Sequence, residues 1–183
     1  MQSDELFDIN IAQVRWDYLD FEEISQRVPH DFVEMIRAKL QNPLFLGPLG
    51  LSLPRHEAIE LFRLLVPCTS SASGGYLMSA AYRKPLVSQE QAQPIAMAYL
   101  HERIHREFSN LHFYDVQFAR EDAMWWTFVV GCEEWKNLIP GALFAPVDKL
   151  DGHIWTDEKM LAYWKANSGD HLFPSHEKKW QKK

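Results

Sequence analysis

The sequence has very little cysteine and no long hydrophobic run. Only Cys68 and Cys132 occur among 183 residues, which is too few for a disulfide scaffold and fits a reducing compartment. No apolar stretch reaches the roughly 20 residues that a membrane-spanning helix needs. Residues 1–5 are acidic and polar, without the hydrophobic region of a signal peptide. We therefore expect a protein of the cytoplasm that does not enter a membrane.

Basic side chains are scarce outside the C-terminal end. The formal net charge is −6, and the last thirteen residues carry four Lys against one Glu, which leaves 24 acidic against 15 basic side chains elsewhere. Nucleic-acid binding requires a basic surface, which this composition does not favour. A basic protein would be attracted to such a chain. Solubility explains the acidity equally well, so charge alone leaves both interpretations open.

The composition is that of a folded protein. Apolar residues make up 46% of the chain and aromatic residues 13%, with seven Trp, and this is enough to build a hydrophobic core. Large aromatic side chains dominate both cores and protein interfaces. The expected organisation is a single domain, 1–183, in four parts: a helix-rich lobe at 1–67, a flexible loop at 68–75, an α+β lobe at 76–166 and a basic tail at 167–183.

The first lobe carries three helix signals. A capping-box pattern at 20–23 precedes a short helix, and residues 31–40 place apolar side chains on one helical face. A third helix is expected to start at Pro54 and to end at Pro67.

The second lobe predicts a long helix and several strands. Ser88 and Gln91 form a second capping-box pattern, and Pro146 makes the last strand of the sheet an edge strand or a bulge. The expected elements are a strand at 76–82, a helix from Ser88 to about Phe108, strands at 113–120, 124–132 and 142–147, and a helix from Thr156 to Trp164. The predicted fold class is α+β, with a helical N-terminal lobe plus a long helix packed on an antiparallel β-meander.

One motif points to a zinc enzyme. His101, Glu102 and His105 match H-E-x-x-H on a predicted helix, where two imidazoles can share a metal and the Glu can act as a base. A third ligand is required, but His112 lies one residue beyond the extended spacing and Glu121 lies in a predicted turn. We therefore interpret the two His as flanking an apolar stripe, expect no metal or cofactor, and keep a zinc hydrolase as a minor alternative.

The cysteines give no catalytic site. Cys132 lies in an apolar predicted strand, which favours a buried structural thiol over a nucleophile. Cys68 lies at the start of the predicted loop, where it could be exposed, and it has no cationic neighbour that would activate it.

Two stretches combine acidic and aromatic side chains, a composition that suits binding of a basic protein because charge steers the encounter and rings supply buried area. The alternative is a solvated surface whose rings point into the core. The candidate partner-binding residues are Trp16, Asp17, Asp20, Glu22 and Glu23 in the first stretch, and Glu133, Glu134, Trp135, Asp148 and Asp151 in the second.

Part of the second lobe resembles a known class of bacterial proteins. The helix 88–100, the strand 125–131 and the segment 139–154, with its Val147-Asp148-Lys149-Leu150-Asp151-Gly152-His153-Ile154 ending, resemble the cystatin-like or NTF2-like immunity domains that protect bacteria from interbacterial toxins, including those of type VI secretion. The resemblance covers under half of the chain. It implies no catalysis, no cofactor and tight neutralisation of one cognate toxin.

We therefore expect an immunity protein, with a basic nuclease toxin as the favoured partner because an acidic inhibitor can occupy a nucleic-acid groove. An NTF2-like or cystatin-like domain that binds or converts a small molecule is the main alternative. The sequence leaves open whether two copies form a homodimer.

Overall fold

The computed structural model describes residues 5–70, 74–108, 110–138 and 141–174. The chain divides into two compact units, the first formed by Met1–Arg83 with Leu161–Lys183 and the second by Lys84–Met160. Both units combine helices with an antiparallel sheet, so the predicted α+β class is confirmed. None of the described helices is long and apolar enough to cross a membrane.

The first unit is built around strand β1 (Leu6–Ala12). Its antiparallel partners are β2 (Leu46–Pro48), β3 (Leu53–Pro54) and β4 (Tyr76–Ser79). In β1, Ile9 and Ile11 are fully buried, because they lie in the core that the strand shares with the helices of this unit.

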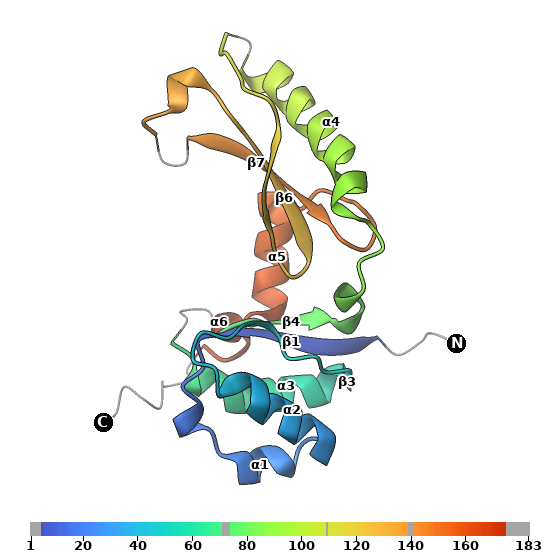
Figure 1. Ribbon diagram of the computed structural model, residues 1–183, viewed down its shortest axis with the longest axis vertical. Helices are drawn as coiled ribbons and strands as arrows, with labels where there is room; N and C mark the ends of the chain where they lie inside the picture. Colours follow the sequence, from blue (N-terminus) through green and yellow to red (C-terminus); the bar gives the residue numbers. More distant parts are fainter. Residues whose placement is uncertain (1–4, 71–73, 109, 139–140, 175–183) are drawn as a thin grey trace. The chain divides into compact units, whose positions relative to one another are not determined.

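Three helices of the first unit confirm the helix predictions. They are α1 (Phe21–Ser25), α2 (His30–Leu40) and α3 (Arg55–Leu65), and Figure 1 shows α1, α2 and α3 on one side of β1. The Asp20 carboxylate accepts the backbone N–H of Glu23 at 3.0 Å, which is the predicted N-cap bond. Ile36, Leu61 and Phe62 are fully buried in the core.

The first unit also contains a sheet that the three helix signals of the helix-rich lobe do not indicate. Asp8 is one of the acidic residues near the start of the sequence, yet its side chain is fully buried in β1. Its Oδ1 accepts the backbone N–H groups of Ile9, Gly50 and Leu51 at 2.7, 3.1 and 3.0 Å. Arg83 Nε lies 3.8 Å from Oδ2. These contacts satisfy a carboxylate that the sequence alone suggests to be solvated.

The loop expected at 68–75 is packed where the structure describes it. Cys68 belongs to the 3₁₀ helix η2 (Val66–Cys68) and is fully buried rather than exposed. Gly75 has φ +103°, and an added Cβ would lie 2.4 Å from the carbonyl oxygen of Asn10, so this position requires glycine. Residues 71–73 lie outside the described part.

The expected basic tail also begins as ordered structure. Asn167 and Ser168 are buried, and the short helix α6 (Gly169–Leu172) follows. Ser168 forms an isolated antiparallel bridge with Tyr76, so this segment belongs to the first unit. The Lys-rich residues 175–183 lie outside the described residues.

The second unit is the predicted helix on a meander. Both halves of the capping box of Ser88 and Gln91 are present at the start of α4 (Gln89–Glu107). The strands are β5 (Gln117–Glu121), β6 (Trp125–Gly131) and β7 (Ala142–Asp148), in the order β5-β6-β7. The 3₁₀ helix η4 (Glu133–Trp135) lies between the last two. Pro146 lies in an edge strand, as predicted.

The core of this unit lies between α4 and one face of the sheet. Leu100, Phe128 and Val130 are buried there, whereas Phe118 is 40% exposed on the outer strand. The two adjacent tryptophans of β6 point to opposite faces: Trp126 packs against the core on the α4 side, and the Trp125 ring lies 5.5 Å from the Trp155 ring.

Candidate functional site

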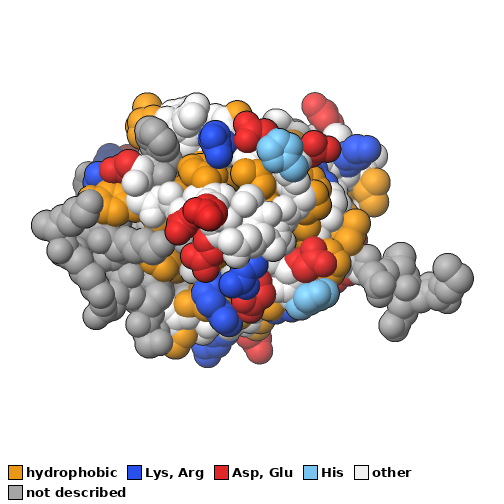
Figure 2. All heavy atoms as spheres, turned by 90° about the horizontal axis from the view of Figure 1, so that it is seen from below, with side chains coloured by type: hydrophobic (Ala, Val, Ile, Leu, Met, Phe, Trp, Pro, Cys, Tyr) orange, Lys and Arg blue, Asp and Glu red, His pale blue; other side chains and the backbone are white. Residues whose placement is uncertain are grey.

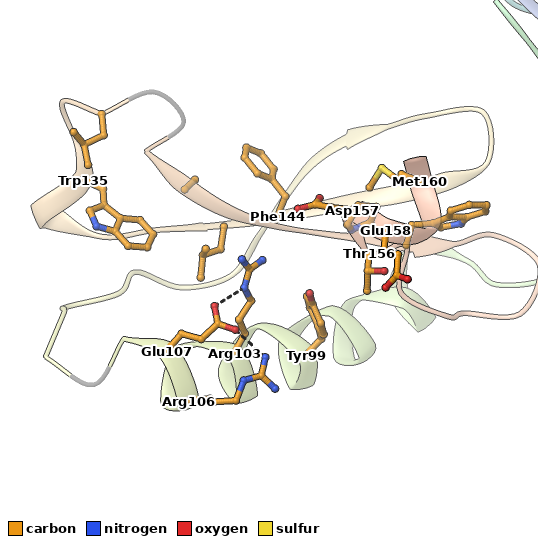
Figure 3. A pocket seen from close by; sticks show the side chains of 15 residues that line it. Tyr99, Arg103, Arg106, Glu107, Trp135, Phe144, Thr156, Asp157, Glu158 and Met160 are labelled. Atoms are coloured by element: carbon orange, nitrogen blue, oxygen red, sulfur yellow. Dashed lines mark hydrogen bonds and ion pairs between the residues drawn. The ribbon is translucent and has the colours of Figure 1, made fainter. Parts of the chain in front are cut away.

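A groove of about 710 Å³ runs along the outer edge of β7 in the second unit. Figure 3 shows Tyr99 and Arg103 pointing from α4 toward the sheet, and the Phe144 ring pointing away from α4. The lining residues come from α4, β7, the segment around η4 and the start of α5 (Asp157–Asn167). They are Tyr99, Arg103, Arg106, Glu107, Trp135, Leu138, Ala142, Leu143, Phe144, Pro146, Trp155, Thr156, Asp157, Glu158 and Met160.

The α4 side of the groove carries a closed set of charge pairs. Tyr99, Arg103 and Glu107 share one face because they are spaced by four residues. Arg103 Nε donates to Glu107 Oε2 at 3.0 Å, and Arg106 Nη2 donates to Glu107 Oε1 at 2.8 Å. The Arg106 and Arg103 guanidinium groups hold the pKa of Glu107 below its ordinary value. Arg106 also lies 3.6 Å from Glu102, so both guanidinium groups of this side already have carboxylate partners within the chain.

The opposite end of the groove carries free acids. The Thr156 hydroxyl accepts the backbone N–H of Lys159 at 3.4 Å, so Thr156 caps the start of α5. Asp157 and Glu158 follow in the first turn, and both are exposed. Within the described part of the chain, neither carboxylate takes part in an ion pair. The charge that the groove offers to a ligand is therefore negative.

Glu133, Glu134 and Trp135 lie together in η4, and each of their side chains already contacts other residues of the chain. Glu134 Oε1 lies 2.9 Å from His112 Nδ1, and this hydrogen bond lowers the pKa of Glu134 to about 2. The Glu133 carboxylate accepts hydrogen bonds from the Tyr114 hydroxyl and from Lys136.

The third residue of this group, Trp135, is half-buried. Its ring contacts the rings of Phe108 and Phe113, with centroids 5.0 and 5.4 Å apart. It therefore supports the core of the second unit as well as the end of the groove.

Asp148 and Asp151 meet in the turn after β7, next to His153. Asp148 is buried, and its Oδ1 accepts the backbone N–H of Leu150 at 2.7 Å. Asp151 is exposed, with its Oδ1 2.6 Å from His153 Nδ1. Asp148, Asp151 and His153 form the one group of three possible metal ligands found among the described residues. Because Asp148 and Asp151 accept backbone N–H groups of this turn, the group holds the turn together.

The first acidic stretch lies around η1 (Trp16–Tyr18) and α1. Asp17 pairs with Arg15 at 3.4 Å, and Glu23 lies 3.8 Å from Arg27. Asp20 caps α1, whereas the Glu22 side chain is exposed. The side chain of Trp16 lies outside the described side chains.

Acidic and basic side chains alternate on this face of the first unit. Figure 2 views the molecule from below Figure 1, where α1 lies, and shows red and blue side chains interspersed with apolar ones. Arg27 also pairs with Glu60 at 3.1 Å, and Arg63 pairs with Glu60 at 3.4 Å. The stretch therefore does not present a continuous acidic patch on the face shown.

The two His of the H-E-x-x-H motif lie on α4 as predicted for the flank of an apolar stripe. His101 and His105 are exposed, while Leu100 on the stripe is buried. Glu102 lies 3.6 Å from Arg106. Among the described residues, no third ligand lies close to these His side chains.

Sequence reasoning missed the groove itself. Tyr99, Arg103 and Glu107 repeat at a spacing of four, which is a local signal for one helix face, but their position beside β7 depends on tertiary packing. Comparison with protein-family models, curated proteins and solved structures finds no match. The function must therefore be argued from the site.

Proposed function

We propose that the chain acts by binding a protein and that it is an immunity protein, which neutralises a basic toxin such as a nuclease effector. The observation that carries this proposal is the groove of the second unit, where Asp157 and Glu158 are exposed without an ion-pair partner among the described residues. A cationic side chain of a partner can approach them without first displacing an internal ion pair. In this proposal the chain acts in the cytoplasm and without catalysis.

The net charge of −6 supports a basic partner. Opposite charge accelerates the encounter of two proteins, and added salt screens that attraction. The exposed Glu22 of the first acidic stretch is a second candidate contact, whereas Glu133 and Glu134 would have to give up internal partners. Charge reversals at single positions can therefore separate the candidate surfaces.

The test is a kinetic measurement of binding to the product of the neighbouring open reading frame, which in this proposal is the toxin, by surface plasmon resonance at two salt concentrations. Glu158→Lys is expected to slow association by about tenfold and to weaken its salt dependence. Asp115→Lys is the matched control, because Asp115 is exposed, lies outside the groove and undergoes the same change of charge. Glu22→Lys tests the first stretch in the same way.

Two outcomes would count against the proposal. If wild-type protein shows no binding to that toxin and does not protect cells that express it, the immunity function is wrong. If Glu158→Lys, Glu22→Lys and Asp115→Lys all bind with wild-type rates, the acids are only a solvated surface. Light scattering on a size-exclusion column measures the molar mass of the protein and shows whether two copies associate.

The size of the groove favours one alternative, a domain that binds a small molecule. A volume of about 710 Å³ lies within the range of small-ligand pockets, and Tyr99 and Trp155 supply aromatic surface. A small molecule that raises the melting temperature of wild-type protein but not of Tyr99→Ala would support this alternative. The support would be strongest if the protein also showed no toxin binding.

A further inference from the structure

The backbone of β7 points alternate residues toward β6 and toward the groove. In an antiparallel pair, the N–H and C=O of one residue face the same side, and the next residue faces the other. The Pro146 carbonyl accepts the Trp155 N–H at 2.9 Å, and Asp148 N–H donates to the His153 carbonyl at 2.9 Å, both outside the sheet. By this alternation, Phe144 also directs its N–H and C=O outward.

One half of this edge is already paired by the chain itself. Residues 153–155 run beside the end of β7, where Val147 and Ile154 form an antiparallel bridge. The geometry of this edge therefore accepts an extended segment. The position that residues 153–155 occupy beside β7 extends along residues 142–145. Among the described residues, no backbone group pairs with the outward N–H and C=O of Phe144.

The open half of β7 lacks the usual protection of an edge strand. Residues 142–145 read Ala-Leu-Phe-Ala, without charge, and the β6–β7 register runs through them without a shift. The other edge of the same sheet, β5, has a bulge between Phe118 and Arg120 and carries Arg120 and Glu121. Bulges and charges are features that prevent strand addition. β5 has both, whereas the open half of β7 has neither, and Pro146 and Asp148 lie in the half that is already paired with residues 153–155.

We propose that an extended segment of a protein partner adds to β7 as a further strand, with a basic side chain of that segment directed at Asp157 and Glu158. The inference rests on the proposed function, in that the partner is a protein. The groove follows the open edge, so that a bound strand has α4 on one side and the Phe144 ring on the other. Main-chain hydrogen bonds to Phe144 hold the segment, and its side chains determine specificity.

A basic segment fits better than an acidic one. Arg103 and Arg106, the cations of the groove, are both paired with Glu107 at 3.0 and 2.8 Å. Asp157 and Glu158 have no such partner among the described residues. An acidic segment would therefore meet unpaired like charges, whereas a basic one would neutralise them.

Two substitutions at one position isolate the main-chain contact. Phe144→Pro removes the outward N–H of residue 144 while leaving the neighbouring residues paired with β6, and Pro146 shows that this strand tolerates proline at an outward position. Phe144→Ala removes the same ring but keeps the N–H. The difference between the two variants therefore reports the hydrogen bond that strand addition requires.

The probes are two synthetic six-residue peptides, Lys-Thr-Val-Thr-Val-Thr and Glu-Thr-Val-Thr-Val-Thr, titrated into full-length protein and followed by amide NMR signals. The Lys peptide is expected to shift the Phe144 and Ala142 amide signals and to bind several-fold more tightly than the Glu peptide. Phe144→Pro is expected to bind it about tenfold more weakly than Phe144→Ala.

Equal binding by Phe144→Pro and Phe144→Ala would overturn strand addition, and equal affinity for the two peptides would overturn the basic preference. If Phe144→Pro does not fold, hydrogen exchange of the wild-type Phe144 amide decides: slower exchange with the Lys peptide supports the proposal, and an unchanged rate refutes it. These results are independent of toxin binding. If the Lys peptide binds but the toxin does not, strand addition in the groove stands and the immunity function is refuted. If the toxin binds but the Lys peptide does not, only strand addition is refuted.

Discussion

The buried carboxylate of Asp148 accepts a hydrogen bond from the indole Nε1–H of Trp155 at 2.8 Å. The same carboxylate accepts the backbone N–H groups of Leu150 and Asp151. It thereby fixes the turn that leads from β7 to the acidic end of the groove. The residue was predicted as a partner contact, and in the structure it organises the site from within.

Removing this carboxylate should destabilise the second unit. Asp148→Ala leaves three N–H donors without their acceptor, so we expect the free energy of unfolding to fall by roughly 1–3 kcal/mol or more. Urea denaturation measures the change, and Asp115→Ala serves as the exposed control. A variant with the wild-type denaturation midpoint would show that these hydrogen bonds contribute nothing.

The helix-on-sheet core should depend on Phe128, which is fully buried. Phe128→Ala is expected to lower the free energy of unfolding by about 3–5 kcal/mol, because it removes packed apolar volume and leaves a cavity. Leu86→Ala is the comparison, since Leu86 is 75% exposed and should change stability by less than about 0.5 kcal/mol. Similar melting temperatures for the two variants would contradict the core assignment.

The buried Asp8 should make the first unit less stable as pH rises. Burial raises the pKa of Asp8 above its ordinary value of 3.8, despite the hydrogen bonds from Leu51, Ile9 and Gly50. Because the folded state binds the proton more tightly than the unfolded state, this contribution is complete below pH 3.8 and is lost as pH rises through the folded pKa.

A pH series of unfolding experiments with Asp8→Asn tests this. The advantage of wild type over Asp8→Asn should shrink as pH rises through that window, since the variant has no carboxyl to ionise. An advantage that grows with pH would show that the hydrogen bonds outweigh burial and lower the pKa of Asp8.

Glu134 should behave in the opposite sense. Its pKa is lowered from 4.5 to about 2, chiefly by the hydrogen bond with His112. The stabilisation is therefore present above pH 4.5 and is lost as pH falls toward 2. NMR titration of the Glu134 carboxyl should show the low pKa in wild type and a return toward 4.5 in His112→Ala. An unchanged low pKa in His112→Ala would assign the effect to the backbone instead.

Purified protein is expected to hold no stoichiometric zinc. His101 and His105 lie exposed on α4, and no third ligand accompanies them among the described residues. Elemental analysis of protein prepared without chelator measures the metal. One tightly bound zinc per chain that disappears in His105→Ala would instead establish the zinc hydrolase.

Sequence patterns predicted the elements whose signals are local. Ser88 and Gln91 lie three residues apart and specify the start of α4 without help from the rest of the chain. The sheet around β1 could not be predicted in this way, because burial of Asp8 depends on the N–H groups of Gly50 and Leu51, more than 40 residues away. The strand itself does have a local signal, because Ile9 and Ile11 alternate with the polar residues Asp8 and Asn10.

The candidate site divides in the same way. The acids Asp157 and Glu158 follow Thr156 and could be placed in a first helical turn from sequence. Their position at one end of a groove depends on β7 pairing with β6 and on Arg103 pairing with Glu107 across a turn of α4. The first of these is a non-local contact, and neither is visible in composition.

The division of the chain into Met1–Arg83 with Leu161–Lys183 and Lys84–Met160 has a consequence for synthesis on the ribosome. Gly75 and Tyr76 pair with Gly169 and Ser168. These partners leave the ribosome about ninety residues later, so the pairing cannot form before then. The inserted unit has by then been translated in full. The second unit can therefore finish folding first, and the first unit, although it leads the chain, is the last to be completed.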